Sequence, residues 1–116
     1  MPGDLFYASE KIGTSVSILA TTHGSLQERL LNAWMSQGHH AVPMGAGQAG
    51  LPMSAALAKE IEEFNDQMSC RPAVGDEGTF AATILRFSDD EATDAAKKIV
   101  EFQYRIDDEI RDSRSG

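Results

Sequence analysis

The chain has few of the features that identify a protein at first reading. It contains a single cysteine, Cys70, so an intramolecular disulfide is impossible and a reducing compartment is expected. No window approaches about 18 uninterrupted apolar residues, and the first residues lack the charged and apolar regions of a signal peptide. These absences predict a cytoplasmic protein without a membrane-spanning segment.

Basic residues are also scarce. Ten lysines and arginines stand against 18 aspartates and glutamates, and the formal net charge is −8. Phosphate backbones and anionic membrane surfaces are bound through lysine and arginine, and the chain has no basic run. Neither nucleic acid nor a membrane is therefore expected as a partner.

The charge is unevenly distributed along the chain. Residues 1–57 carry three acids and two bases, a net charge of −1, whereas residues 58–116 carry fifteen acids and eight bases, a net charge of −7. This asymmetry predicts that self-association uses the first two helices, and that the last helix faces solvent or a basic partner.

Strand patterns are missing, and helical periodicity is frequent instead. Apolar residues at steps of three and four predict a helix over residues 5–21, capped by Asp4 and stopped near Gly24. Ser25 and Glu28 form a capping box that begins a second helix, which ends near residue 38. The short link between the two helices predicts an αα-hairpin.

Three further helices are expected after residue 52. An apolar stripe predicts one over residues 53–69, a short one follows over 76–87, and a capping box of Ser88 and Glu91 begins the last. Residues 111–116 are expected to fray. Hydrophobic residues make up 41% of the chain, enough for one core. The predicted fold is all-α, a single-domain bundle of about five helices over residues 1–116.

Residues 39–52 are rich in glycine and proline and show no periodicity, which predicts a flexible surface loop. Within it, residues 45–50 match G-x-G-x-x-G. That motif binds a dinucleotide only where a strand precedes it and a helix begins at it, whereas here the preceding residues form a poor strand and Pro52 follows. We therefore expect no cofactor.

Candidate metal ligands and nucleophiles are few: His23, His39, His40 and Cys70. They show none of the spacings of known zinc or di-iron sites, so no metal is expected. Cys70 lies beside Arg71, but a catalytic cysteine needs a histidine base close in space. The inventory favours a protein that is not an enzyme. A small enzyme or ligand-binding protein with a pocket near the 39–52 loop is the first alternative.

Three acidic runs, around residues 60–63, 89–91 and 107–109, lack the spacing of a calcium loop and are expected on solvated helix faces. The link at residues 23–25 is compatible with a helix-turn-helix, but the helix after it offers one basic residue, Arg29. A DNA-related regulator, or an acidic antagonist of a basic protein, is the second alternative.

The second helix carries apolar residues on more than one face. Leu31 and Met35 form an edge beside the stripe that contains Trp34, so Leu31, Trp34 and Met35 are the candidate interface. Glutamate in place of Leu31 or Met35 is expected to break a homodimer formed there. The sequence thus favours a non-enzymatic protein-interaction or self-associating module, acting as a homodimer or as the acidic partner of another protein.

Overall fold

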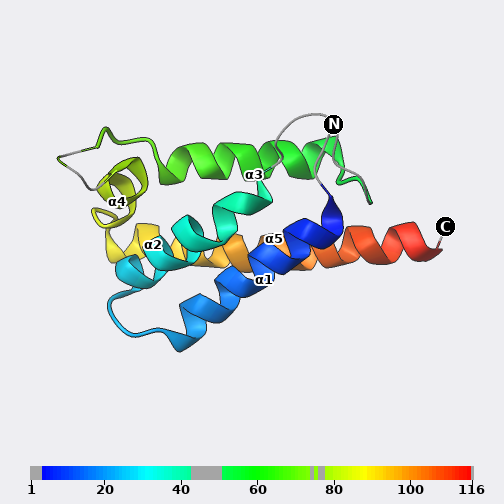
Figure 1. The fold of residues 1–116 in the computed structure, drawn as a ribbon, viewed down its shortest axis with the longest axis horizontal. Coiled ribbons are helices and arrows are strands. Elements are labelled where there is room, and N and C mark those ends of the chain that lie inside the picture. Colours follow the sequence, from blue (N-terminus) through cyan, green and yellow to red (C-terminus); the bar gives the residue numbers. More distant parts are fainter. Residues whose placement is uncertain (1–3, 43–50, 74, 76–77, 116) are drawn as a thin grey trace.

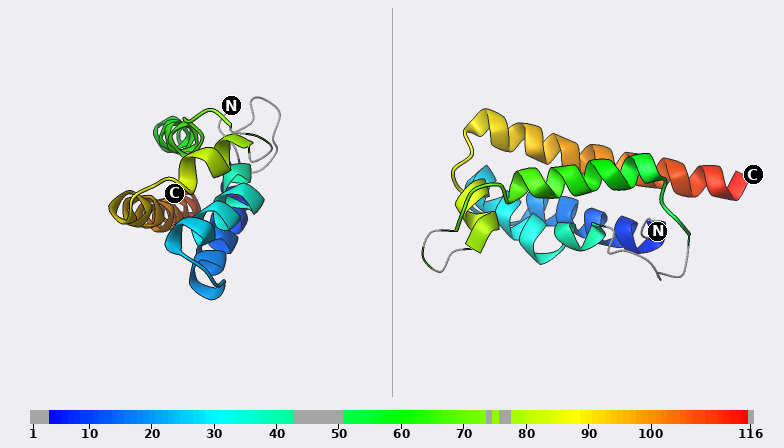
Figure 2. Two further views of the ribbon diagram at one scale, coloured as in Figure 1. Left: turned by 90° about the vertical axis from the view of Figure 1, so that its left-hand side faces the viewer. Right: turned by 90° about the horizontal axis from the view of Figure 1, so that it is seen from above.

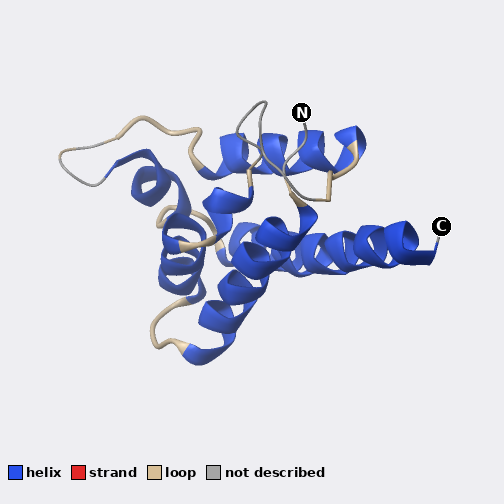
Figure 3. Cartoon of the chain, turned by 45° about the vertical axis from the view of Figure 1, so that its right-hand side comes forward, coloured by secondary structure: helices blue, strands red, loops and turns tan. Residues whose placement is uncertain are grey.

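A computed structural model describes residues 4–42, 51–73, 75 and 78–115, and its described elements are all helical (Figures 1 and 3). Five α-helices and one 3-10 helix follow one another along the chain. They are α1 (Leu5–Thr21), α2 (Leu26–Ser36), η1 (Gly38–Ala41), α3 (Ala55–Met68), α4 (Gly78–Ile84) and α5 (Asp89–Ser115). This confirms the predicted all-α bundle of four longer helices and one short one.

The hairpin of α1 and α2 follows from local sequence signals. The Asp4 carboxylate accepts hydrogen bonds from the backbone N–H groups of Phe6 and Tyr7, both at 3.3 Å, which satisfies free donors at the start of α1. At the start of α2, Ser25 and Glu28 form the reciprocal capping box. Gly24 adopts a φ of 113° between the helices, a conformation that favours glycine. The predicted αα-hairpin is confirmed.

An aromatic series joins three helices at the centre of the core. The rings of Trp34 in α2 and Phe64 in α3 meet edge to face at 4.9 Å, and Phe64 meets Phe102 of α5 in the same way at 5.4 Å. Trp34 is fully buried, and its indole N–H donates to Asn65 Oδ1 at 2.9 Å. The burial of each such ring contributes about 1.5–3 kcal/mol to folding.

The two longest helices, α1 and α5, pack against each other and run in opposite directions. The other helices are arranged around this pair. α5 packs against α1 and α2, while α4 contacts α2 and the end of α3. In the view along the bundle (Figure 2, left), α3 lies beside α5 and the α1–α2 hairpin lies on the other side of the shared core. Within the part of the chain that the structure describes, no helix is both long enough and apolar enough to cross a membrane.

Both ends of the segment expected to form a loop, residues 39–52, make defined contacts in the structure. Residues 38–41 form η1, with Gly38 and Ala41 buried against the hairpin. At the other end, the Leu51 carbonyl accepts from Leu5 N–H at 2.7 Å, and Leu51 N–H donates to the Asp4 carboxylate at 2.9 Å. Tertiary contacts fix these backbone groups despite the weak local propensity of the sequence. Residues 43–50, including the G-x-G-x-x-G match, lie outside the described residues.

Two further boundaries differ from the sequence prediction. α4 ends at Ile84 rather than at residue 87, because the chain tightens there: Arg86 N–H and Phe87 N–H bond to carbonyls three residues back. The expected start of α4 at residues 76–77 lies outside the described part. α5 is helical as far as Ser115, within the segment expected to fray, and its last turns extend beyond α1 (Figure 1). An Arg111–Asp108 pair at 3.2 Å spans one of these turns.

Candidate functional site

The three residues of the candidate interface occupy different environments. Trp34 is fully buried and offers no surface to another molecule. Leu31 is half-buried against the core, and Met35 is 48% exposed between the polar, exposed residues Asn32 and Ser36. Apart from the partly buried Leu26 at its start, the apolar surface that α2 presents to solvent is therefore limited to Met35 and part of Leu31.

The histidines and the cysteine do not come together. His39 and His40 stack at 4.1 Å between ring centroids in η1, and the Nδ1 atom of His39 lies 3.0 Å from the Trp34 carbonyl. Desolvation, together with the charges of His39 and Lys11, lowers the pKa of His40 from its ordinary value. Over the described ranges, no group of three or more His, Cys, Asp or Glu side chains converges on a point that could hold a metal ion. Cys70 is exposed beyond the end of α3.

Polar residues of α2 that a recognition helix would turn toward DNA are used inside the fold. The Gln27 amide donates to the Phe87 carbonyl at 3.0 Å and to the Asp89 carboxylate at 3.1 Å. Arg29 donates to the Leu19 carbonyl at 2.7 Å. These bonds tie the hairpin together and tie it to the start of α5, so they give Gln27 and Arg29 a structural role.

At least one carboxylate from each acidic run makes a structural contact. The predicted capping box of Ser88 and Glu91 is confirmed, whereas the contacts of Glu60 and Glu109 were not predicted. Glu91 caps α5 by accepting from Ser88 N–H at 2.9 Å. Glu109 binds Ser54, at the start of α3, through both of its oxygens. Glu60 binds Lys98 and Arg105 of α5. The sequence shows acidic residues in α3 and basic residues in α5, which is compatible with ion pairs between the two helices. Only the packing of α3 against α5 shows which residues pair.

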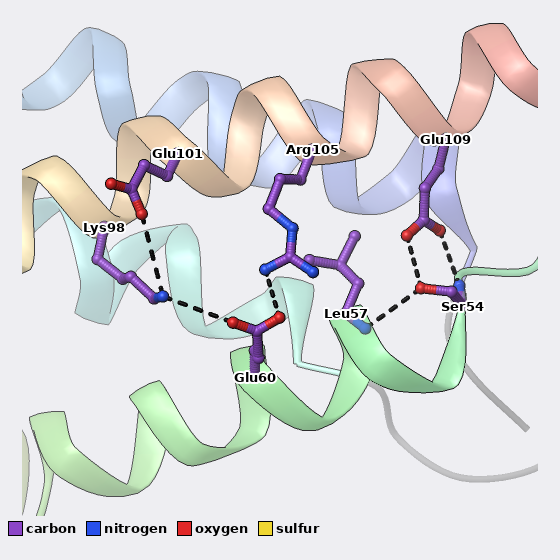
Figure 4. A network of polar contacts seen from close by, with 7 residues as sticks. All are labelled: Ser54, Leu57, Glu60, Lys98, Glu101, Arg105 and Glu109. Carbon is purple, nitrogen blue, oxygen red and sulfur yellow. Dashed lines mark hydrogen bonds and ion pairs between the residues drawn. The ribbon is translucent and has the colours of Figure 1, made fainter.

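Figure 4 shows how these contacts connect α3 to α5. Glu60 extends from α3 toward both cations of α5, with Lys98 Nζ at 3.6 Å, and Lys98 also lies 4.0 Å from Glu101. The hydrogen bond from Arg105, with the positive charges of Arg105 and Lys98, lowers the pKa of Glu60 below its ordinary value despite partial desolvation. The Glu60, Lys98 and Arg105 side chains remain more than one-third exposed, so solvent screens the pairs.

Two concave surfaces flank α5. The first, which we name the α1–α5 groove, has a volume of about 560 Å³. Its wall consists mainly of small and branched apolar side chains from α1, α2 and α5, with polar groups at the rim. The lining residues are Val16, Leu19, Ala20, Leu26, Arg29, Thr93, Ala96, Lys97, Val100 and Glu101.

Of the charged side chains on this rim, Arg29 and Glu101 have partners within the protein, and Lys97 has no ion-pair partner among the described residues. Arg29 is held by the Leu19 carbonyl, and Glu101 has a 4.0 Å contact with Lys98. Lys97 forms no ion pair with any residue that the structure describes. Lys97 and Glu101 are one helical turn apart, so the exposed side of α5 at the groove carries a positive and a negative group in sequence.

The second surface, which we name the α3–α5 pocket, has a volume of about 510 Å³. Phe64, Met68 and Ala95, all buried, form its floor, and half-buried Phe87 lies at one end. The remaining lining residues are polar or charged, apart from the thiol of Cys70: Glu60, Glu63, Gln67, Arg71, Glu91, Asp94 and Lys98.

The sequence predicted neither surface. Neither is lined by a described residue of the 39–52 segment, where a pocket was the first alternative. Ala96 and Val100 are apolar in the sequence, but only the packing of α1 and α2 against α5 shows that they line a groove. The α3–α5 pocket contains Cys70 without any histidine, so it does not supply the base that a catalytic cysteine requires.

Comparisons with protein-family models, with curated proteins and with solved structures found no match to this chain. The two surfaces beside α5 are therefore the features of the fold that bear on its function.

Proposed function

We propose that this protein is a non-enzymatic protein-interaction module that self-associates through the α1–α5 groove. The observation that carries the proposal is the groove itself, an open apolar surface built from three helices and bordered by Lys97 and Glu101. Water is displaced from such a surface when a second apolar surface covers it, and concave apolar surfaces of this kind accept a helix as a binding partner.

Charge complementarity makes a second copy of the chain the proposed occupant. In a two-fold symmetric dimer the same surface is used by both copies, so each residue i that faces residue j is matched by j facing i. A two-fold axis level with position 99 would pair the α5 helices in opposite directions. It would set Lys97 beside Glu101 of the second copy, and Glu101 beside Lys97 of that copy. The two opposite charges would thus be satisfied twice.

The size of α5 also supports this arrangement. The helix has 27 residues, so it extends about 40 Å at a rise of about 1.5 Å per residue. The contact region of Thr93, Ala96 and Val100 offers small side chains that allow two helices to approach closely. At the competing interface, Met35 is 48% exposed and Leu31 is half-buried, whereas Trp34 is fully buried and is not accessible to a partner. The lone exposed cysteine favours the reducing cytoplasm as the location of this assembly.

A charge-exchange experiment tests the proposal. Lys97→Glu and Glu101→Lys each place like charges opposite each other in the dimer, and both variants should sediment as monomers where the wild-type chain is a dimer. An equimolar mixture of the two variants restores both opposite-charge pairs and should form a heterodimer.

The controls make the same charge changes on α3, away from the groove: Lys59→Glu and Glu62→Lys, both at exposed positions. These variants should remain dimers. A monomeric wild-type chain at high micromolar concentration would overturn the proposal. So would dimers that persist in both groove variants, or a mixture that stays monomeric while each variant keeps its helical content.

A further inference from the structure

The α3–α5 pocket lies on a different side of α5 from the α1–α5 groove and is a second candidate binding site. Its α5 residues are Glu91, Asp94, Ala95 and Lys98, whereas the groove uses Thr93, Ala96, Lys97, Val100 and Glu101. No lining residue is shared between the two surfaces. A ligand bound in the pocket would therefore leave the groove available.

Most charges around the pocket already have partners. Glu60 binds Lys98 and Arg105. Glu91 accepts from Ser88 N–H, and the positive charge of Arg71 lies close enough to help lower its pKa, after the two contacts with Ser88. The ion pairs of Glu60 join α3 to α5, the two walls of the pocket. The positive and negative charges of these partnered groups nearly balance.

Two carboxylates are left over, one on each wall. Asp94 on α5 is exposed and has no hydrogen bond or ion pair with any residue in the described ranges. Glu63 on α3 has only a contact of 4.0 Å with Lys59, and both of those side chains are well exposed. Such a pair contributes little, so Glu63 is available to another cation. The uncompensated charge of the pocket is negative.

The floor of the pocket is apolar and closely packed. Phe64 is 5% exposed and Met68 is 1% exposed, and the Phe64 ring is held edge to face between Trp34 and Phe102. An aromatic and thioether floor below two carboxylates suits a lysine or arginine side chain, whose aliphatic stem covers apolar surface while its charged group stays at the rim.

From this arrangement we propose that the α3–α5 pocket binds a short basic, apolar peptide segment of a partner protein. One cationic side chain lies over Phe64 and Met68, and its charged group pairs with Asp94 and Glu63. An apolar neighbour in the peptide contacts Phe87. The volume of about 510 Å³ is within the range of small-ligand pockets. The net charge of −8 favours the approach of such a segment.

Cys70 provides a readout, because it is the only cysteine of the chain, is exposed and lines the pocket. The probe is the peptide acetyl-Leu-Arg-Leu-Leu-Arg-amide, and its matched control replaces both arginines with glutamate. At saturation the basic peptide should slow alkylation of Cys70 severalfold, and the acidic peptide should leave the rate unchanged.

Charge reversal at the pocket separates this site from general attraction to an acidic chain. Asp94→Lys and Glu63→Lys should each weaken the basic peptide about tenfold or more. Asp108→Lys, an equal change at an exposed α5 position outside the pocket, should retain most of the affinity. The proposal is overturned if the basic peptide gives no protection, if the acidic peptide protects equally, or if Asp108→Lys weakens binding as much as Asp94→Lys. Unchanged circular dichroism spectra ensure that all variants are folded.

Discussion

Ser54 and Glu109 are joined by two hydrogen bonds that fix the beginning of α3 against the end of α5. The Ser54 hydroxyl donates to one carboxylate oxygen at 2.5 Å, and its backbone N–H donates to the other at 2.8 Å (Figure 4). The same hydroxyl oxygen accepts from Leu57 N–H at 3.2 Å. A single serine therefore caps one helix and anchors it to another.

Loss of this serine should lower the free energy of unfolding more than loss of its partner. Ser54→Ala removes the cap of α3 together with one of the two bonds to Glu109, and should cost about 1–2 kcal/mol. Glu109→Ala keeps the cap and should cost about 0.5–1 kcal/mol. Urea unfolding of the two single variants and the double variant measures the coupling between them. Asp108→Ala, at the neighbouring exposed carboxylate, should change stability by less than about 0.5 kcal/mol. Strictly additive losses would show that the two residues do not interact.

The Glu60–Arg105 contact should make stability depend on pH in the acid range. In the folded protein the pKa of Glu60 lies below its ordinary value of 4.5, chiefly through the Arg105 hydrogen bond. The stabilising contribution of Glu60 is therefore fully present above about pH 4.5 and is lost as the pH falls through the lower, folded-state pKa.

Arg105→Gln should remove part of this acid dependence. The pKa of Glu60 should move back toward its ordinary value, which carbon-detected NMR titration measures directly. At neutral pH the variant should lose less than about 1 kcal/mol, because both side chains are more than one-third exposed. Lys59→Gln, which changes an exposed cation on the same face of α3 as Glu63, is the control and should leave the Glu60 titration unaltered. An unchanged Glu60 pKa in Arg105→Gln would contradict the assignment.

Gly38 and Gly13 should respond in opposite ways to replacement by alanine. A Cβ atom at Gly38 would lie 2.7 Å from Ser15 Oγ and closer still to the Trp34 ring, and both of those groups are buried. Gly38→Ala should therefore destabilise the protein by about 1–3 kcal/mol. A Cβ at Gly13 would meet only the amide end of Gln103, at 3.3 Å, which can rotate away.

Gly13→Ala should then stabilise α1 by about 0.5–1 kcal/mol, since glycine is unfavourable within a helix. Thermal and urea unfolding of the two variants provides the comparison. Equal effects of the two substitutions would show that the close approach of η1 to Trp34 is not maintained in solution.

The contrast between these glycines indicates how far the sequence predicts the fold. Helix beginnings at Asp4, Ser25 and Ser88 follow from side chains that bond to backbone groups within three residues, so local reasoning finds them. Burial of Gly38 depends on Trp34 and Ser15, more than three residues away in the chain. The anchoring of Leu51 by Asp4 spans 47 residues, and no local pattern reports it.

The two candidate surfaces could not be predicted from the sequence either, because they depend on contacts between residues that are distant in the chain. The sequence shows that Ala96 and Val100 are apolar residues of a helix, but it does not show that they line an open groove between α1 and α5. It also places Trp34 on the apolar stripe without showing that Phe64 and Asn65 bury its ring and satisfy its N–H. The uneven charge of the chain predicted an acidic second half, yet the pairing of Glu60 with Arg105 and of Glu109 with Ser54 depends on how α3 lies along α5.

Two substitutions that each introduce a glutamate distinguish the dimer interface expected from the sequence, on α2, from the α1–α5 groove. Val100→Glu places a charge in the wall of the α1–α5 groove, and Met35→Glu places the same charge at an exposed position of α2. If the groove is the dimer contact, Val100→Glu should weaken the dimer by a factor of about 100 or more, because an unpaired carboxylate would be buried. Met35→Glu should leave the dimer intact.

The reverse result would assign the contact to Leu31 and Met35 on α2. Sedimentation equilibrium over a range of concentrations gives both dissociation constants. Circular dichroism identifies any loss of folding, which is expected to be small because Met35 is 48% exposed and Val100 is only partly buried. Ser113→Glu, at an exposed α5 position more than about 100° round the helix from Val100, is the control. A dimer that Ser113→Glu disrupts as strongly as Val100→Glu would show that added negative charge on α5, rather than occupation of the groove, controls association.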